Sequence, residues 1–206
     1  MVLPKALSLS ASYPTSTLGP VGILNTGGFL YKYLDGTAGT PNDAAVFRFP
    51  SLDTCNGHPD QACRYHYHKN PENCIAGNDA CTLVGYLGDG FPIYSYCTIN
   101  GTQLRSCYSQ TAGTTGYSTS DYTFNTTAQS FGLCHLDRGN GYCFNASRGV
   151  LVGSGCFYGY VLSPNYPFVM PAYHGATWYG VRSTTAPAVV ATPSHHRRPY
   201  TQTLQC

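Results

Sequence analysis

Three histidines within eleven residues of this 206-residue chain have the spacing of metal ligands. His66 and His68 alternate with tyrosines in the segment Tyr65-His66-Tyr67-His68. Successive side chains of a β-strand point to opposite faces, so a strand here places both imidazoles on one face, where their nitrogens can reach one ion. His58, which follows a glycine, can supply a third nitrogen. Imidazole ligands suit copper or zinc, so a copper or zinc site is one of the interpretations that the sequence supports.

A carboxylate is a further candidate ligand for this site. Asp89 lies in an Asp-Gly turn and is the acidic residue that we add to His58, His66 and His68 as a metal ligand. Two other interpretations stay open. Histidine and tyrosine rings can fill a sheet face for structural reasons. Acid–base catalysis needs a positioned partner, and the sequence does not identify one. No catalytic residue is therefore predicted, and whether the protein is an enzyme stays open.

The amino-acid sequence around these residues resembles that of the YHYH-domain family of secreted and surface proteins. The resemblance rests on three blocks in this order: Asp53 to His58, Tyr65 to His68, and Gly85 to Tyr94, with Cys74 between the last two. Family members often repeat the histidine motif further along the chain, but here the corresponding region, His135 to Phe144, lacks the second histidine pair. The resemblance implies an extracellular or cell-surface location and no particular activity.

The cysteine content indicates an oxidising compartment. The number is even and no C-x-x-C pair occurs, which argues against zinc ribbons and cytosolic redox motifs and favours five disulfides in a secreted protein. The ten cysteines are Cys55, Cys63, Cys74, Cys81, Cys97, Cys107, Cys134, Cys143, Cys156 and Cys206.

Two disulfide schemes fit the cysteine spacing. Pairing of nearest neighbours gives Cys55–Cys63, Cys74–Cys81, Cys97–Cys107, Cys134–Cys143 and Cys156–Cys206. A crossed scheme gives Cys55–Cys74 and Cys63–Cys81, which bracket the histidine strand. We favour the crossed scheme because Cys55 and Cys74 both belong to the part of the sequence that resembles the family, although sequence alone does not fix connectivity.

Surface chemistry is consistent with an extracellular glycoprotein. Asn100, Asn125 and Asn145 each begin an Asn-x-Ser/Thr sequon, and N-linked glycans there would help to solubilise a chain in which only 10% of residues are charged. A net charge of +2 is too small to indicate nucleic acid or an anionic membrane as a partner. Because no apolar run approaches about 18 residues, no transmembrane helix is predicted.

The composition predicts an all-β fold. With 23 glycines and 14 prolines spread along the chain and no long 3.6-residue apolar period, we expect little helix and a sandwich or distorted barrel with long disulfide-stapled loops. The predicted organisation is an extended N-terminal arm over residues 1–22, a YHYH-like β domain over 23–180, and a Thr/Pro-rich tail over 181–206. Within the domain, we expect a strand at 44–49 and a surface loop at 111–130.

The sequence supports two hypotheses about function. The first is an extracellular, glycosylated structural or interaction protein of the cell surface or matrix, which self-associates into an oligomer, filament or polymer through the N-terminal arm. An arm with strand alternation can add to the sheet edge of a neighbour. The alternative is a metal-binding module or metal-dependent enzyme that uses the His-x-His strand.

Overall fold

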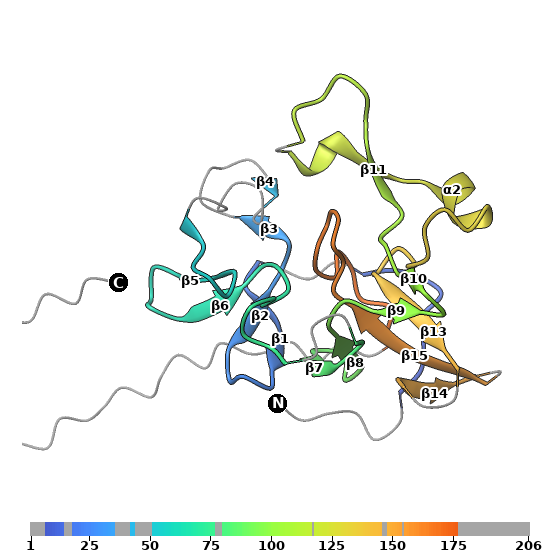
Figure 1. The fold of residues 1–206 in the computed structure, drawn as a ribbon, viewed down its shortest axis with the longest axis horizontal. Coiled ribbons are helices and arrows are strands. Elements are labelled where there is room, and N and C mark those ends of the chain that lie inside the picture. The colour runs from blue at the N-terminus through green and yellow to red at the C-terminus, as the bar shows by residue number, and fades with distance from the viewer. Residues whose placement is uncertain are drawn as a thin grey trace, which may run out of the picture.

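The structure of the chain is a computed structural model. It describes residues 7–14, 18–35, 42–43, 51–76, 80–116, 118–145, 148–153 and 155–176. Most of the strands join one mixed sheet with the order β13-β15-β8-β7-β1-β2-β6-β5, in which β14 also pairs with β15 (Figure 1). They are β1 (Pro20–Leu24), β2 (Phe29–Tyr31), β5 (Gly57–Pro59), β6 (Tyr65–Tyr67), β7 (Leu83–Leu87), β8 (Pro92–Tyr94), β13 (Gly141–Phe144), β14 (Val150–Val152) and β15 (Cys156–Val161).

The described residues also form two-stranded ribbons beside the sheet. These are β3 (Leu34–Asp35) with β4 (Asn42–Asp43), β9 (Thr98–Ile99) with β10 (Thr102–Gln103), and β11 (Tyr108–Gln110) with β12 (Tyr122–Phe124). The predicted all-β class with little helix is confirmed. The described residues contain only the short helix α2 (Thr126–Ser130) and short 3-10 turns such as η2 (Thr119–Asp121), and their sheet does not close into a barrel. None of their helices is long and apolar enough to cross a membrane.

The two halves of the sheet repeat one arrangement. In the first half, β1 pairs antiparallel with β2, β2 parallel with β6, and β6 antiparallel with β5. The second half follows the same scheme with β7, β8, β15 and β13 in the corresponding places. The halves meet where β1 and β7 pair antiparallel. The sheet therefore has an internal pseudo-twofold relation between the histidine-bearing half and the half that ends in β13.

The amino-acid sequence carries the same repeat. Residues 21–33 (VGILNTGGFLYKY) and 84–96 (VGYLGDGFPIYSY) align without a gap and form the two equivalent strand pairs. Each pair turns at a glycine with a left-handed backbone, Gly27 at φ +85° and Gly90 at φ +90°. Only glycine adopts that conformation freely, so both turns need it. Two segments that fold alike and align without a gap indicate a duplicated unit.

A second repeated element is the Leu-Asp-x-x-Asn-Gly turn that leads into β5 and β13. In both copies one aspartate accepts two backbone N–H bonds and a tyrosine hydroxyl, which fixes the turn against the neighbouring strand. The bonds run to Asp53 from Cys55 N (2.8 Å), Gly57 N (3.0 Å) and Tyr65 Oη (2.5 Å), and to Asp137 from Gly139 N (2.8 Å), Gly141 N (2.8 Å) and Tyr158 Oη (2.8 Å).

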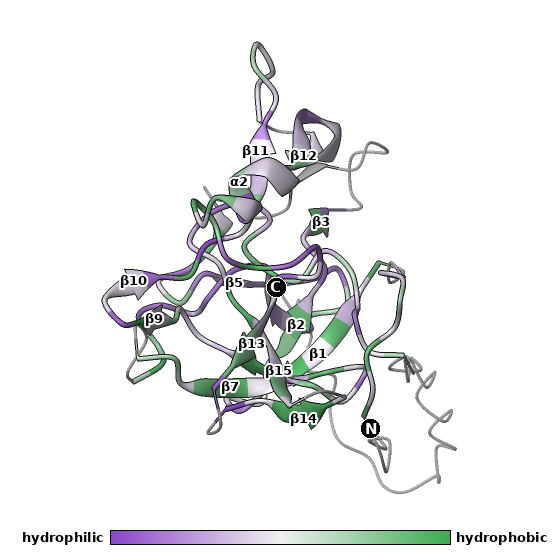
Figure 2. Cartoon of the chain, turned by 90° about the vertical axis from the view of Figure 1, so that its right-hand side faces the viewer, coloured by the Kyte–Doolittle hydropathy of each residue, from purple (hydrophilic) through white to green (hydrophobic). Residues whose placement is uncertain are grey.

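Tyrosine supplies much of the core. Figure 2 shows apolar residues on β1, β7 and β14 and mostly polar residues along β10 and β11. Tyr158, Tyr160 and Tyr173 are among the largest fully buried side chains. Their hydroxyls donate to Asp137, to Asp89 and to the Val21 carbonyl, respectively. Buried tyrosines are tolerated because each hydroxyl has a partner.

The observed disulfides correct both predicted schemes. Cys55–Cys74 forms, as the crossed scheme predicts, and Cys63 is also disulfide-bonded. However, Cys81 pairs with Cys97 rather than with Cys63 or Cys74, because these two cysteines flank the β7–β8 hairpin and antiparallel pairing brings its ends together. The remaining described bonds are Cys107–Cys134 and Cys143–Cys156, so the other nearest-neighbour pairs are wrong. Cys206 lies outside the described residues.

Several predicted segments differ from the structure or fall outside it. The expected loop at 111–130 is instead the end of a ribbon, in which β12 and α2 follow a turn. Strand β1 begins at Pro20, inside the predicted arm 1–22. The expected strand at 44–49 and the tail 181–206 lie outside the described residues. The described part of the arm pairs within the chain: Leu9 bridges Gly175, and Ser10 N donates to His174 O at 2.7 Å.

Candidate metal centre

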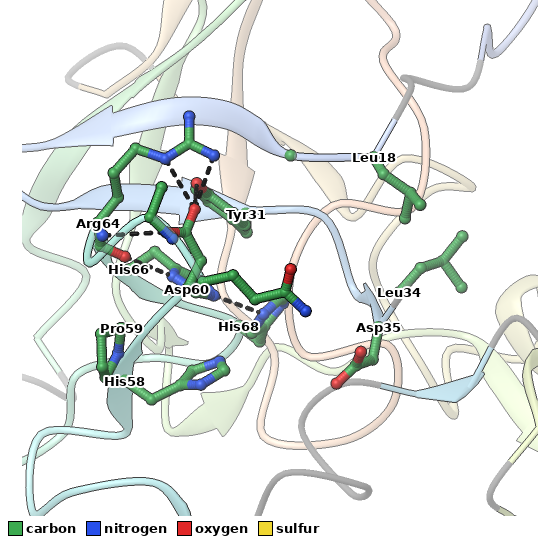
Figure 3. A pocket seen from close by; sticks show the side chains of 13 residues that line it. Leu18, Tyr31, Leu34, Asp35, His58, Pro59, Asp60, Arg64, His66 and His68 are labelled. Atoms are coloured by element: carbon green, nitrogen blue, oxygen red, sulfur yellow. Dashed lines mark hydrogen bonds and ion pairs between the residues drawn. The ribbon is translucent and has the colours of Figure 1, made fainter. Parts of the chain in front are cut away.

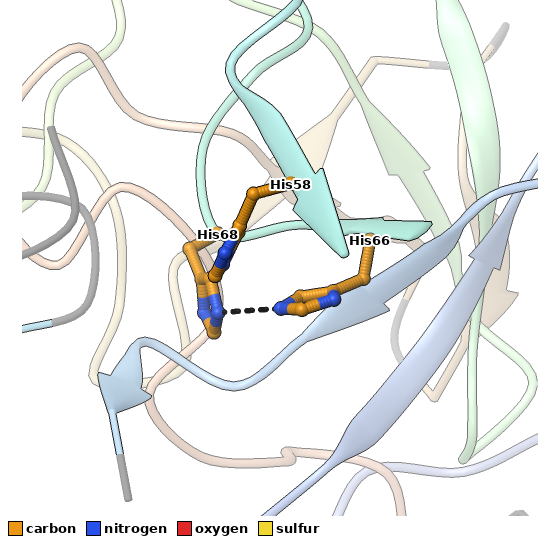
Figure 4. Close-up of side chains that lie close together, drawn as sticks. All are labelled: His58, His66 and His68. Carbon is orange, nitrogen blue, oxygen red and sulfur yellow. Dashed lines mark hydrogen bonds between the residues drawn. The ribbon is translucent and has the colours of Figure 1, made fainter. Parts of the chain in front are cut away.

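His58, His66 and His68 converge at one end of the sheet, as the sequence predicts. His58 comes from β5, while His66 lies in β6 and His68 directly follows that strand (Figure 4). The antiparallel register sets His58 opposite His66, and the two-residue spacing puts His68 on the same face. One ring nitrogen of each histidine lies within 4.8 Å of the others.

The backbone around the site holds the imidazoles at fixed angles. His66 Nδ1 lies 3.0 Å from the Arg64 carbonyl oxygen, and His68 Nδ1 lies 2.6 Å from the Lys32 carbonyl oxygen. A carbonyl oxygen can only accept, so each Nδ1 carries a hydrogen. In a neutral ring the other nitrogen, Nε2, then has a lone pair. The two Nε2 atoms face each other at 3.0 Å.

Burial keeps these rings neutral. Loss of water contact lowers the pKa of His68 to about 3, and the neighbouring His66 contributes in the same direction. Burial also lowers the pKa of His66. Both rings are therefore neutral at neutral pH, with two lone pairs directed at each other and no hydrogen between them. Such an arrangement is stabilised by a cation placed between the nitrogens.

The geometry fits a tetrahedral metal ion. With metal–nitrogen bonds of about 2.0–2.1 Å, two imidazole nitrogens on a tetrahedral ion lie about 3.3 Å apart. The observed separation of 3.0 Å for His66 and His68 is close to that spacing, and the nitrogen of His58 lies within 4.8 Å of the other two. Metal-binding histidines usually donate their second N–H to a carbonyl or carboxylate, as His66 and His68 do here. Three imidazoles leave one coordination position for another ligand.

A pocket of about 720 Å³ opens beside the histidines (Figure 3). The Tyr31 ring stacks on His66 with ring centres 3.8 Å apart and planes inclined by 21°. The Tyr31 hydroxyl donates to Asp60 at 2.8 Å, and Arg64 pairs with the same carboxylate at 2.7 Å. Burial raises the pKa of Tyr31 to about 12, and the bond to Asp60 adds to that effect. Because this pocket borders the histidines, the site is open to small molecules on one side.

Asp60 is held as a carboxylate by its neighbours. Burial opposes its charge, but bonds from the Arg64 backbone, the Tyr31 hydroxyl, the Arg64 guanidinium and the Ala62 N–H outweigh burial and keep the pKa of Asp60 well below its usual range. Sequence reasoning missed Tyr31, Asp60 and Arg64 as site residues. Tyr31 reaches the site only because β2 pairs with β6, a contact between segments far apart in sequence.

The structure does not bring Asp89 to the histidines. Its carboxylate accepts from the Tyr160 hydroxyl at 2.5 Å and from Gly175 N at 3.0 Å, in the second half of the sheet. Burial raises the pKa of Asp89. The predicted ligand set is therefore corrected to the three histidines. Asp89 lies in the turn between β7 and β8, and the residue at the equivalent position of the first half is Thr26.

The second half of the sheet has no histidine at the equivalent places. Aligning the parallel pairs Leu30–Tyr67 and Ile93–Tyr160 makes the halves comparable residue by residue. The matching positions are Tyr142 for His58, Gly159 for His66 and Val161 for His68. A Cβ on Gly159 would lie 2.9 Å from the Tyr94 ring, so an aromatic side chain fills the space. The same strand arrangement thus forms without the histidines.

The predicted glycosylation sites differ in exposure. Asn100 and Asn145 are exposed, the first in the turn between β9 and β10 and the second directly after β13. Asn125 is half-buried and caps α2, because its side-chain oxygen accepts from Ala128 N at 2.8 Å. Glycosylation at all three asparagines stays a prediction.

Comparison with known proteins gives one family. A family model described as YHYH protein matches residues 11–175 of the chain. No curated protein and no solved structure gives a match. The matched range includes the three histidines and both halves of the sheet.

Proposed function

The chain belongs to the YHYH protein family, and from that premise we propose that it is an extracellular metal-binding protein in which His58, His66 and His68 hold one copper or zinc ion. The single observation that carries the proposal is the orientation of two rings. Each Nδ1 donates to a carbonyl oxygen, so two neutral imidazoles direct their Nε2 lone pairs at each other across 3.0 Å. A divalent cation between them turns this repulsion into attraction.

The structural alternative for the histidines has less support. If the sheet needed imidazoles in these places, the equivalent positions of the second half should need them too. They are Tyr142, Gly159 and Val161, and the same strands pair around them. A tyrosine or valine side chain also packs in a buried position as well as a neutral imidazole does, so packing alone does not require histidine. This contrast favours a ligand-binding role for the first half.

Extracellular location is part of the proposal. Disulfides such as Cys55–Cys74, which joins the segments on either side of the histidine strand, persist in oxidising compartments. The sequons at Asn100 and Asn145, both exposed, fit secretion as well. Self-association through the N-terminal arm stays a prediction, but residues 8–10 already use backbone hydrogen bonds within the chain.

Metal content tests the proposal. The secreted protein is purified without chelator or metal column, dialysed against zinc or copper, and analysed for bound metal and for affinity by competition with a chromophoric chelator. Wild-type protein should hold one ion per chain, and the double variant His66→Ala, His68→Ala should lose it. His135→Ala is the matched control, since this histidine lies in the Cys134–Leu136 segment away from the site. Equal metal binding by the double variant and wild type would refute the proposal.

A further inference from the structure

The Asp60 carboxylate joins the turn between β5 and β6 to strand β2 (Figure 3). Its Oδ1 accepts from Ala62 N at 2.8 Å and from Arg64 N at 3.0 Å, which closes the turn. Its Oδ2 accepts from the Tyr31 hydroxyl at 2.8 Å and from Arg64 Nε at 2.7 Å. Both oxygens therefore have partners, and the guanidinium offsets the negative charge. One carboxylate thus fixes Tyr31 and Arg64 relative to each other.

Tyr31 and Arg64 are the two residues that hold the ring of His66. The Tyr31 ring stacks on the imidazole with ring centres 3.8 Å apart. The Arg64 carbonyl oxygen accepts from His66 Nδ1 at 3.0 Å, and it also accepts from the backbone N–H of Asp60 at 3.0 Å. Two separate contacts of His66, one with its ring face and one with Nδ1, therefore depend on Asp60.

The tyrosine that corresponds to Tyr31 in the second half of the sheet makes a different contact. It is Tyr94, whose ring packs against Gly159, the residue in the place of His66. Its hydroxyl oxygen accepts from Gly149 N at 2.8 Å. The connection between β13 and β15 contains β14, whereas the short turn over residues 60–64 joins β5 and β6. The bond between this tyrosine and a carboxylate therefore accompanies the histidines.

We propose that Asp60 is a positioning residue of the metal centre, which holds His66 in its ligand orientation through Tyr31 and Arg64. The inference rests on the proposed function, because it concerns His66 as a metal ligand. An imidazole that is already oriented loses little rotamer freedom when an ion binds, so its ordering does not weaken binding. The ring of His68 is held by a different acceptor, the Lys32 carbonyl.

Solvent exchange of the imidazole N–H hydrogens, followed by NMR, tests the positioning role in metal-free protein. Asp60→Asn should speed exchange of the His66 Nδ1 hydrogen about fivefold, since losing one hydrogen bond lets the ring leave its carbonyl acceptor more often. The His68 hydrogen should keep its wild-type rate. Asp137→Asn is the matched control, because Asp137 also accepts from two backbone N–H groups and a tyrosine hydroxyl, but in the other half. It should leave both histidines unchanged.

Zinc affinity, measured by competition with a chromophoric chelator, tests the consequence for the metal centre. Asp60→Asn should weaken binding about tenfold, the lower end of the range for outer residues that orient a metal ligand. Tyr31→Phe keeps the ring and changes no charge, so its loss of about fivefold separates the bond to Asp60 from any effect of the charge of that carboxylate. The double variant should bind no more weakly than Asp60→Asn, because both changes break one path.

The outcomes separate this inference from the proposed function. If wild-type protein binds no zinc, the proposed function fails. If wild-type protein binds zinc and both single variants keep its affinity, only the role of Asp60 is refuted. Losses that multiply in the double variant, or equal acceleration of exchange at His66 and His68, would also overturn it. If Asp60→Asn does not fold, Tyr31→Phe decides: weaker zinc binding with faster exchange at His66 alone supports the inference, and wild-type behaviour overturns it.

Discussion

Acidification of the metal-free protein should destabilise it through His68. The native state keeps this ring neutral, with a pKa of about 3, whereas the unfolded chain has the ordinary value of 6.5. The unfolded state therefore binds a proton first as the pH falls, and stability is lost from about pH 6.5 down to about pH 3. Between pH 7 and pH 5 the loss from this residue is about 2 kcal/mol, from 1.36 kcal/mol per pKa unit.

Denaturation in the presence of a chelator measures this effect. For a domain of this size, about 2 kcal/mol corresponds to a fall in Tm of about 4–8 °C between the two pH values. His68→Leu should be less stable at both pH values, because the Lys32 carbonyl loses its donor, but its stability should depend less on pH by about 2 kcal/mol. His135→Ala should keep the wild-type dependence. A His68→Leu variant with the full wild-type loss between pH 7 and pH 5 would refute the assignment of a buried neutral ring.

Three further substitutions test the scaffold, each by urea denaturation of the oxidised protein. Gly85→Ala should destabilise by about 3 kcal/mol, because the new Cβ would lie 2.2 Å from the Ile23 carbonyl oxygen at the junction of the two halves; wild-type stability would contradict this close approach. Replacing Cys55 and Cys74 together by serine should cost about 2–5 kcal/mol and weaken metal binding, since that bond joins the segments on either side of the histidine strand. Asn140→Ala should cost about 1–3 kcal/mol, because Asn140 has a left-handed backbone and donates to a buried carbonyl; a neutral effect would argue against the turn geometry.

The sequence predicts the local part of the site well. Strand alternation alone places His66 and His68 on one face, and the short turn over residues 60–64 between β5 and β6 brings His58 opposite His66. These relations depend only on residues near each other in the chain. The prediction of Asp89 as a ligand is wrong because a turn aspartate gives no sign of its partner, and the partner, Tyr160, comes from a strand far along the chain.

Long-range pairing accounts for what the sequence did not provide. Tyr31 reaches the site through the parallel pairing of β2 with β6, which no local pattern specifies. The repeat was a different case: residues 21–33 and 84–96 align without a gap, so a search of the chain against itself would have found it. That alignment would also have indicated the hairpin flanked by Cys81 and Cys97.

Nitrogen-15 NMR of the imidazole rings tests the central claim most directly, because it reports which ring nitrogen carries the hydrogen and which binds the metal. In metal-free protein near pH 7, His66 and His68 should both be neutral with the hydrogen on Nδ1. One equivalent of zinc should then shift the Nε2 resonances of both rings, and a ring-nitrogen resonance of His58, while leaving His135 unchanged. An Nε2-bound hydrogen on either ring of metal-free protein, together with resonances that do not respond to zinc, would contradict a metal centre at these three histidines.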